Sequence, residues 1–209
     1  MRVYMTTIRT VAVIGAGQMG SGIAQTVATG GYQVRLYDLS AERIPLALGE
    51  IAASLARRAA RGLITQAEAD AALARIQPVT SLIEAAKADL VIEAASEDEV
   101  VKKSVFADLT PLLDADTLLA SNTSSISITR LASVTDRPDR FIGLHFMKPA
   151  PTMKLVEIVR GIATSAATHE AAVAFAESLG KITTESEDFP AFIVNRILVP
   201  MMNEAIYVL

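Results

Sequence analysis

The feature that most constrains this chain is a glycine-rich turn near its start. Val11–Ile14 is a short apolar run without polar alternation, as expected for a strand covered on both faces. Gly15–Gly20 reads G-A-G-Q-M-G and follows it directly, and an amphipathic stretch carrying Ile23 and Val27 comes next. A strand, a G-x-G-x-x-G turn and a helix in this order predict the first unit of a doubly wound α/β fold.

The same turn predicts a dinucleotide ligand. Gly15 permits the tight turn, Gly17 lets the backbone approach a pyrophosphate, and Gly20 allows close contact between helix and strand. Asp38 ends the next predicted strand, where a carboxylate can hold a ribose diol and repel a 2′-phosphate. The pattern therefore favours NAD over NADP, although structural glycines and a solvated aspartate would read the same way. Besides Asp38, the residues expected to bind the cofactor are Gly15, Gly17, Gln18, Met19 and Gly20.

Short apolar runs alternate with longer Ala-rich stretches over most of the chain. Further strands are predicted at residues 34–37, 90–92, 118–120, 141–146, 155–159 and 182–184. Alternating strands and helices of these lengths imply a Rossmann-type, doubly wound and mostly parallel sheet. There is no internal repeat or polar linker.

Helix ends can be read at several places. Residues 65–68 and 96–99 both fit a capping box, with a hydroxyl first and a carboxylate three residues later. Gly62 fits the end of a helix that starts near Ala41. Thr168 fits the cap of a helix that stops at Gly180.

The pattern changes near Pro190, where Ala191–Leu209 is apolar on nearly every face of a helix. Such a helix must be buried on more than one side. We expect residues 1–188 to form the NAD-binding domain and residues 189–209 to form the first helix of a truncated, all-helical second domain. Asn195, Arg196 and Glu204 interrupt the run, so a buried helix is favoured over a membrane span.

Composition excludes several classes of function. The net charge of −4 draws the chain neither to nucleic acid nor to an anionic membrane. The absence of cysteine excludes disulfides, thiolate catalysis and Cys-ligated metals, and no metal site is expected. Residues 1–10 lack the apolar core of a secretory signal, so we expect a cytoplasmic protein.

Hydride transfer between an alcohol and NAD needs a base, and histidine is the usual one near neutral pH. The chain has two histidines. His169 lies beside a predicted helix start and is expected on the surface. His145 lies at the end of the apolar run Phe141–Phe146, and ligands of open α/β sheets bind at the carboxyl ends of strands. Taken alone, a histidine there is more often a buried structural residue.

Four further motifs favour catalysis: Ser121–Ser125, Gly143–Phe146, Leu155–Ile158 and Phe192–Arg196. They occur in the order and spacing of the L-3-hydroxyacyl-CoA dehydrogenases, and the chain resembles that family from Thr10 to Leu209. The resemblance implies NAD-dependent oxidation of the 3-hydroxyl of a short-chain (S)-3-hydroxyacyl-CoA to the 3-ketoacyl-CoA. It also implies an acyl-CoA partner and a homo-oligomer, since the full-length family dimerises through its helical domain.

The resemblance assigns roles to the residues of these motifs. It implies that His145 is the general acid/base and that Glu157 orients its ring and stabilises the imidazolium. Ser124 and Asn195 match the two polar residues that hydrogen-bond the reacting oxygen. Without the resemblance, Glu157 would be an outward strand residue, Ser124 a helix cap and Asn195 a polar break in an apolar helix.

Other positions match the family less sharply. Glu97 and Lys102 match the pair that reaches the nicotinamide-side ribose, and Ser54 and Arg61 match positions that contact CoA. Arg57 and Arg58 extend a basic cluster on the same helix, which a solvated face would explain equally well.

One departure from the family concerns the site, because Lys148 stands where the family usually has asparagine. Acyl specificity is therefore open. A related dehydrogenase of small hydroxy acids, or a nucleotide-binding module without turnover, remain the alternative hypotheses.

Overall fold

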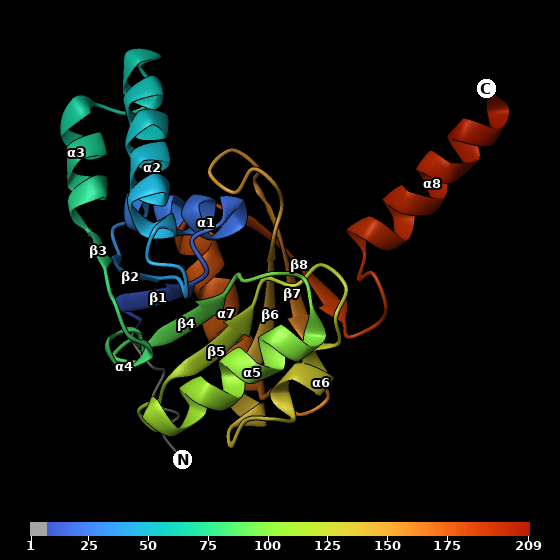
Figure 1. Cartoon of the computed structure of the whole chain (residues 1–209). Coiled ribbons are helices and arrows are strands. Elements are labelled where there is room, and N and C mark those ends of the chain that lie inside the picture. The colour runs from blue at the N-terminus through green and yellow to red at the C-terminus, as the bar shows by residue number, and fades with distance from the viewer. Residues whose placement is uncertain (1–7) are drawn as a thin grey trace.

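The computed structural model describes residues 8–209 and builds them around an eight-stranded sheet (Figure 1). The strand order is β3-β2-β1-β4-β5-β6-β7-β8, and neighbours run parallel except β6 and β7, which are antiparallel. The strands are β1 (Thr10–Ile14), β2 (Gln33–Tyr37), β3 (Ile76–Pro78), β4 (Leu90–Glu93), β5 (Leu118–Ser121), β6 (Phe141–Phe146), β7 (Leu155–Arg160) and β8 (Ile182–Glu187). The mostly parallel, doubly wound sheet is confirmed, with β3 as a strand that the pattern did not predict. The prediction about a secretory signal falls mainly on residues 1–7, which lie outside the described residues.

Helices cover both faces of the sheet (Figure 1). They are α1 (Gln18–Thr29), α2 (Arg43–Ala60), α3 (Gln66–Ala74), α4 (Leu82–Ala85), α5 (Glu99–Leu109), α6 (Ile128–Ala132), α7 (Ala166–Ser178) and α8 (Val194–Val208), with 3₁₀ turns at Thr110–Leu112 and Pro138–Arg140. Successive strand residues point to opposite faces. Val11 and Val13 therefore join the core beneath α1, α2, α3 and α7, while Ala12 and Ile14 join the core beneath α4, α5 and α6.

Two of the predicted helix ends are confirmed by the structure, and two predicted capping residues are wrong. Thr65 and Glu68 form a capping box, and Gly62, at φ 67°, follows the end of α2. Ser96 does not cap α5, because the Asp98 carboxylate lies closer to the helix and accepts the N–H groups of Val100 and Val101. Thr168 does not cap α7 either, since the helix begins one turn earlier.

The cap of α7 is Ser165, whose hydroxyl accepts the N–H of Thr168. Thr168 itself lies in the first turn of the helix, where its own hydroxyl donates to the Asp139 carbonyl. The local pattern predicted a hydroxyl-bearing cap, but it placed this cap at Thr168, three residues after the true cap Ser165.

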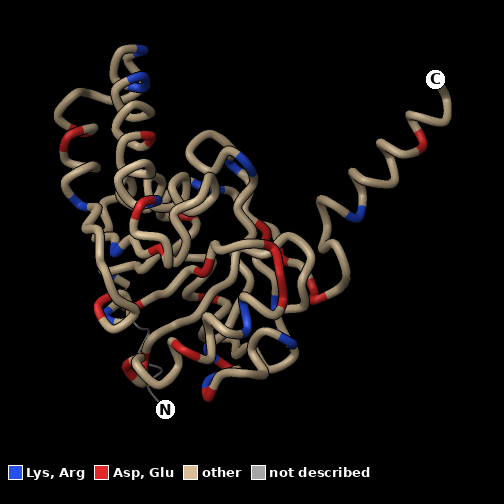
Figure 2. Tube along the Cα trace, in the orientation of Figure 1, with Lys and Arg blue, Asp and Glu red and all other residues tan. Residues whose placement is uncertain are grey.

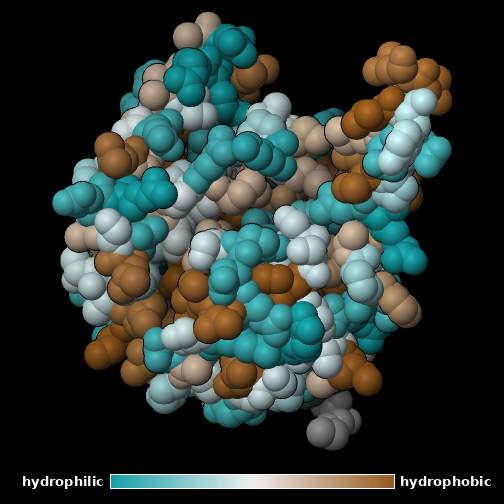
Figure 3. Space-filling model, turned by 45° about the vertical axis from the view of Figure 1, so that its right-hand side comes forward, coloured by the Kyte–Doolittle hydropathy of each residue, from teal (hydrophilic) through white to brown (hydrophobic). Residues whose placement is uncertain are grey.

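The C-terminal helix also starts later than predicted. α8 begins at Val194, and the residues after Pro190 form a turn in which Ala191 and Phe192 have φ values of 68° and 49°. This turn buries Phe192 in the core beneath α5 and α6. α8 itself has no buried residue and projects from the body of the protein (Figure 1). Its apolar side chains form a brown surface in Figure 3. Within residues 8–209, no helix has the length and hydropathy required to cross a membrane.

Candidate functional site

The glycine-rich turn connects β1 to α1 at the carboxyl edge of the sheet. Gly15 has φ 105°, and its N–H donates to the Tyr37 carbonyl at 2.8 Å. A Cβ on Gly20 would lie 1.8 Å from the Gly15 carbonyl oxygen, so only glycine fits there. A Cβ on Gly17 would meet nothing within 4 Å, and this backbone therefore faces open space. The free amides at the start of α1 face the same space, as a phosphate site requires.

Asp38 follows the last residue of β2 and binds the glycine-rich turn directly. Its Oδ2 accepts the N–H of Ala16 at 2.7 Å, and its Oδ1 accepts the N–H of Ser40 at 2.9 Å. The carboxylate is thus fixed beside the start of α1. The sequence suggested a ribose ligand here but not this second role in holding the turn.

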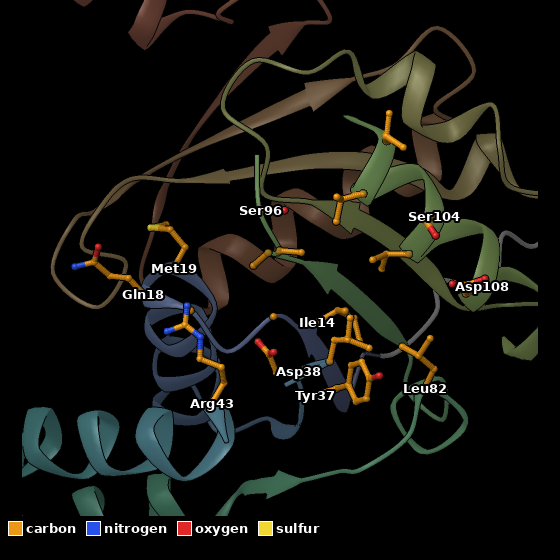
Figure 4. Close-up of a pocket in the computed structure, with 18 residues that line it drawn as sticks. Ile14, Gln18, Met19, Tyr37, Asp38, Arg43, Leu82, Ser96, Ser104 and Asp108 are labelled. Carbon is orange, nitrogen blue, oxygen red and sulfur yellow. The ribbon is translucent and has the colours of Figure 1, made fainter. Parts of the chain in front are cut away.

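A cavity of about 840 Å³ opens beside these residues (Figure 4). It is lined by Gly15, Gly17, Gln18, Met19 and Asp38, whereas Gly20 is buried behind the turn. The opposite wall is formed by the β4–α5 connection and by α5, which contributes Val101 and Val105, and Leu82 of α4 adds a further apolar side chain. A glycine cradle, a fixed carboxylate and an apolar wall suit the phosphates, ribose and flat base of a dinucleotide, so the residues present fit NAD.

The next strand end carries a buried charge that the sequence did not single out. Glu93, the last residue of β4, is 0% exposed and binds Lys102 Nζ of α5 at 2.8 and 2.9 Å. Lys102 is 1% exposed, and its Nζ lies 3.5 Å from Glu97 Oε2. One feature of the sequence could have predicted this pair: Glu93 is a charged residue at the end of a buried strand, and a charge there needs a partner.

Glu97 connects this pair to the loop after β5. Its Oε1 accepts the Thr123 hydroxyl at 2.6 Å and the Ser124 N–H at 2.7 Å. Asn195, in the first turn of α8, donates its side-chain amide to the Ser124 carbonyl oxygen at 3.3 Å. The structure thus brings Glu97, Ser124 and Asn195 together, as neighbours from three separate segments.

His145 and Glu157 form a buried pair across the antiparallel strands β6 and β7. They are directly opposite in register, and His145 Nδ1 lies 2.6 Å from Glu157 Oε2. Glu157 Oε1 also accepts the N–H groups of Ile193 and Val194 at 2.9 and 2.8 Å. Burial opposes ionisation of Glu157, but the hydrogen bonds from His145, Val194 and Ile193 outweigh it, so the pKa of this carboxyl is lowered. Glu157 is therefore an inward-facing carboxylate rather than the outward strand residue of the alternative interpretation.

The turn before α8 also contacts the histidine. The ring of Phe192 meets that of His145 edge to face, with 5.8 Å between centroids. Asn122 fixes the same strand end, because its side-chain oxygen accepts the Phe146 N–H at 2.9 Å. His145 is 6% exposed and has its Nδ1 occupied, which leaves Nε2 as the ring nitrogen available to a ligand. A carboxylate-oriented imidazole of this kind can accept and return a proton.

The second histidine has no such setting. His169 is only partly exposed rather than fully solvated, and its Nε2 lies 3.6 Å from Glu185 Oε2 on β8. It belongs to the first turns of α7, and it does not line the dinucleotide cavity. The structure favours His145 as the histidine of the site.

The basic face of α2 lies beside the loop that joins β6 to β7. Arg58 donates to the Pro151 carbonyl at 3.1 Å, so it fastens this loop instead of being a freely solvated charge. Lys181 donates to the carbonyls of Ala150 and Met153 at 2.6 and 2.9 Å, and burial together with the Arg58 charge lowers the pKa of its ammonium. Lys148 is exposed on the same loop.

The two residues predicted to contact CoA lie further along α2. Ser54 is half-buried in that helix, and Arg61 is exposed just beyond its last residue. No hydrogen bond among the described residues joins either of them to the His145 pair. In Figure 2 the far end of α2 is a concentration of positive charge at the edge of the molecule.

Known proteins share this architecture and sequence. Residues 10–189 match the family model of the 3-hydroxyacyl-CoA dehydrogenase NAD-binding domain. The chain is 54% identical over 202 residues to 3-hydroxybutyryl-CoA dehydrogenase of Bradyrhizobium diazoefficiens, which covers 97% of this chain and 69% of that protein. It is 48% identical to 3-hydroxyadipyl-CoA dehydrogenase of Escherichia coli, over 96% of this chain and 42% of that one.

A solved structure agrees with both comparisons. (S)-3-hydroxybutyryl-CoA dehydrogenase from Ralstonia eutropha superposes with a TM-score of 0.93 at 45% identity, covering 95% of this chain and 70% of that one. Together with the glycine turn, the dinucleotide cavity and the buried histidine–carboxylate pair, these similarities settle the family. The chain is an NAD-dependent oxidoreductase and belongs to the 3-hydroxyacyl-CoA dehydrogenase family.

Proposed function

We propose that this chain oxidises the 3-hydroxyl of short-chain (S)-3-hydroxyacyl-CoA thioesters, with His145 as the general acid/base. The observation that carries the proposal is the buried His145–Glu157 pair, 2.6 Å apart, at the sheet edge that also holds the dinucleotide cavity. The names of the relatives from B. diazoefficiens and R. eutropha support a short acyl chain. The E. coli relative, named for a longer dicarboxylic acyl group, leaves chain length to be measured.

In this proposal the substrate hydroxyl binds next to His145 Nε2, because Nδ1 already binds Glu157. Bound NAD supplies the hydride acceptor. His145 takes the hydroxyl proton, and Glu157 stabilises the positive ring that results. Ser124 and Asn195 hydrogen-bond the reacting oxygen, for which uncharged donors suit both alcohol and ketone.

The remaining site residues position the two ligands. Gly15, Gly17, Gln18 and Met19 would hold the NAD pyrophosphate, Gly20 would serve the cofactor by letting α1 pack closely behind the turn, and Asp38 would bind the adenosine ribose. Glu97 would reach the nicotinamide-side ribose, and the buried Lys102 would support it from behind. Ser54 and Arg61 contact the CoA moiety, whose phosphates suit the basic end of α2.

We further propose that residues 1–188 act as the NAD-binding domain and that residues 189–209 begin a helical unit through which the protein forms a homodimer. The exposed apolar surface of α8 supports this division, because such a surface is usually covered by another chain or domain. Phe192, buried beneath α5 and α6, ties the second segment to the first. A cytoplasmic location stays a prediction.

The test is NADH formation by the wild-type chain with (S)-3-hydroxyacyl-CoA thioesters of increasing length and with the corresponding free acids. We expect the four-carbon thioester to be used best and the free acids poorly. Preference for free acids would favour the small hydroxy acid alternative. NAD binding without turnover of any substrate would favour the nucleotide-binding module.

A further inference from the structure

The buried carboxylate of Glu93, paired with Lys102, is hydrogen-bonded at both of its oxygens. Glu93 accepts four hydrogen bonds: two from Lys102 Nζ, one from the Ala95 N–H at 2.7 Å and one from the Ser121 hydroxyl at 2.7 Å. Both side chains are shielded from water, at 0% and 1% exposed. Each carboxylate oxygen thus has two donors, and the carboxylate cannot turn without breaking several contacts.

Stability alone is a weak explanation for such a pair. Removing two ions from water costs free energy that their attraction often only recovers, and apolar residues of similar volume frequently stabilise a core as well. The hydrogen bonds of this pair are directional, so they fix the positions of the Ala95 N–H and the Ser121 hydroxyl, which apolar side chains would not bind. The groups held by the Glu93–Lys102 pair therefore indicate its role.

Glu93 lies between the cofactor and catalytic parts of the sheet edge. In register it is opposite Ile14, just before the glycine turn, on one side and Ser121, just before the Ser124 loop, on the other. Through the Ala95 N–H it also holds the β4–α5 connection, which lines the dinucleotide cavity.

From this anchor, contacts continue to the catalytic loop. Lys102 Nζ turns its remaining side towards Glu97 Oε2 at 3.5 Å. Glu97 Oε1 in turn holds the Thr123 hydroxyl and the Ser124 N–H at 2.6 and 2.7 Å. Glu97 is 42% exposed at its side chain, so without the cation beside it this carboxylate has water as an alternative partner.

We propose that Glu93 is a positioning residue: with Lys102 it sets Glu97, and through Glu97 it sets Ser124 relative to the cofactor cavity. This rests on the proposed function, in which Ser124 holds the reacting oxygen. Without the Glu93 charge, Lys102 has no buried counter-ion and moves towards Glu97 or loses its proton. In the first case the ammonium draws the Glu97 carboxylate away from Thr123 and Ser124, and in the second Glu97 loses its neighbouring cation and water competes for its carboxylate.

The experiment is a double-mutant cycle of Glu93→Gln and Glu97→Gln, assayed by NADH formation well below the unfolding temperature. Glu93→Gln should lower kcat about 10–100-fold, the range that follows removal of a partner that orients a metal ligand. If Glu93 acts through Glu97, the double variant should be no slower than Glu97→Gln alone. Multiplying losses, or wild-type kcat in Glu93→Gln, would overturn the proposal.

Two further variants guard the interpretation. Asp89→Asn, at the other end of the β4 region, loses a carboxylate that accepts the N–H groups of Arg9 and Thr10, and it should lower the unfolding temperature but keep kcat. Glu93→Asp keeps the charge but withdraws it by one methylene, so it remains informative if Glu93→Gln does not fold. It should also lose kcat, by a smaller factor, and wild-type kcat there would contradict the positioning role. Wild-type protein without turnover would instead contradict the proposed function.

Discussion

The proposed cofactor end of the site, at β1, α1 and β2, and the proposed catalytic end, at β5, β6, β7 and the start of α8, are held in place by different means. At the cofactor end the groups that we propose to bind NAD are mostly backbone, fixed by glycine packing and by the Asp38 carboxylate. At the catalytic end they are side chains. Glu157 accepts N–H groups from the segment where α8 begins, and Asn195 lies in the first turn of that exposed helix. All residues of the cofactor end belong to the sheet domain, whereas the catalytic end also needs residues from the segment that follows it.

This difference implies that the two ends can fail separately. A change at the catalytic end should abolish turnover and leave NAD bound, because no contact of the glycine turn runs through His145 or Glu157. A change at the cofactor end should weaken NAD without altering the chemistry of the bound complex. The following variants test that separation, from the largest expected effect to the smallest.

His145→Gln should have the largest effect. Removing a positioned acid/base typically costs about 10²–10⁴-fold in rate. NAD affinity should stay nearly unchanged, because the histidine lies outside the residues that line the dinucleotide cavity. Steady-state NADH formation measures turnover, and titration with NAD measures its affinity. Near-normal turnover would place the base elsewhere.

Asp38→Ala tests the cofactor end. Loss of a charged hydrogen-bond partner should weaken NAD by about 1.5–3 kcal/mol. NADP should be affected far less, because the same substitution removes the charge that repels its 2′-phosphate. Titration with both cofactors measures the difference, and kcat at saturating NAD should change little. Equal losses for NAD and NADP would remove Asp38 from the ribose site.

Glu157→Gln should reduce kcat less than His145→Gln, about 10–100-fold, since the histidine stays but loses the carboxylate that orients it. The pKa of Glu157 is lowered in the folded protein, so its ionised form stabilises the fold at neutral pH. That stabilisation is lost as the pH falls through the lowered pKa. The gap in unfolding temperature between wild type and Glu157→Gln should therefore be largest near neutral pH and shrink under acid conditions. A gap independent of pH would mean that the charge of Glu157 does not contribute.

The sequence predicted the cofactor end better than the catalytic end, for a physical reason. The turn at Gly15–Gly20 and the short apolar strands are local patterns, and each follows from the conformations open to a few adjacent residues. The sheet order and the antiparallel pairing of β6 with β7 depend on contacts between distant segments. His145 could be proposed from its place at a strand end, but its partner Glu157 rested on family resemblance.

Glu93 and Phe192 show what the local pattern cannot supply. Glu93 reads as an ordinary charged residue after an apolar run, and only the fold shows that Lys102 reaches it from α5. Phe192 reads as the start of an apolar helix, yet a turn with positive φ values at Ala191 and Phe192 places it against His145. Positive φ is uncommon for residues other than glycine, and such a turn is held by its tertiary contacts rather than chosen by the local sequence.

The smallest expected effect on turnover, and the one that bears most on the comparison, concerns α8. This helix exposes large apolar side chains along its length: Ile197, Leu198, Val199, Met201, Met202, Ile206, Tyr207 and Val208. Figure 2 shows almost no charge along it. A surface of this kind promotes association. Asn195, near its base, is held by one hydrogen bond of 3.3 Å to Ser124.

We therefore expect the 209-residue chain either to associate through α8 or to open there, with Asn195 poorly held and turnover weaker than that of a longer form in both cases. Light scattering measures association, and amide hydrogen exchange measures opening. If α8 opens, its amides should exchange far faster than those of the sheet. Ile206→Lys, at a position 67% exposed, should reduce association without changing the unfolding temperature of the sheet domain. Ile162→Lys, on an exposed loop, is the matched control and should leave association unchanged. A monomer with strongly protected amides from Met202 to Val208 would show that α8 needs no partner, and the catalytic end would then be as self-sufficient as the cofactor end.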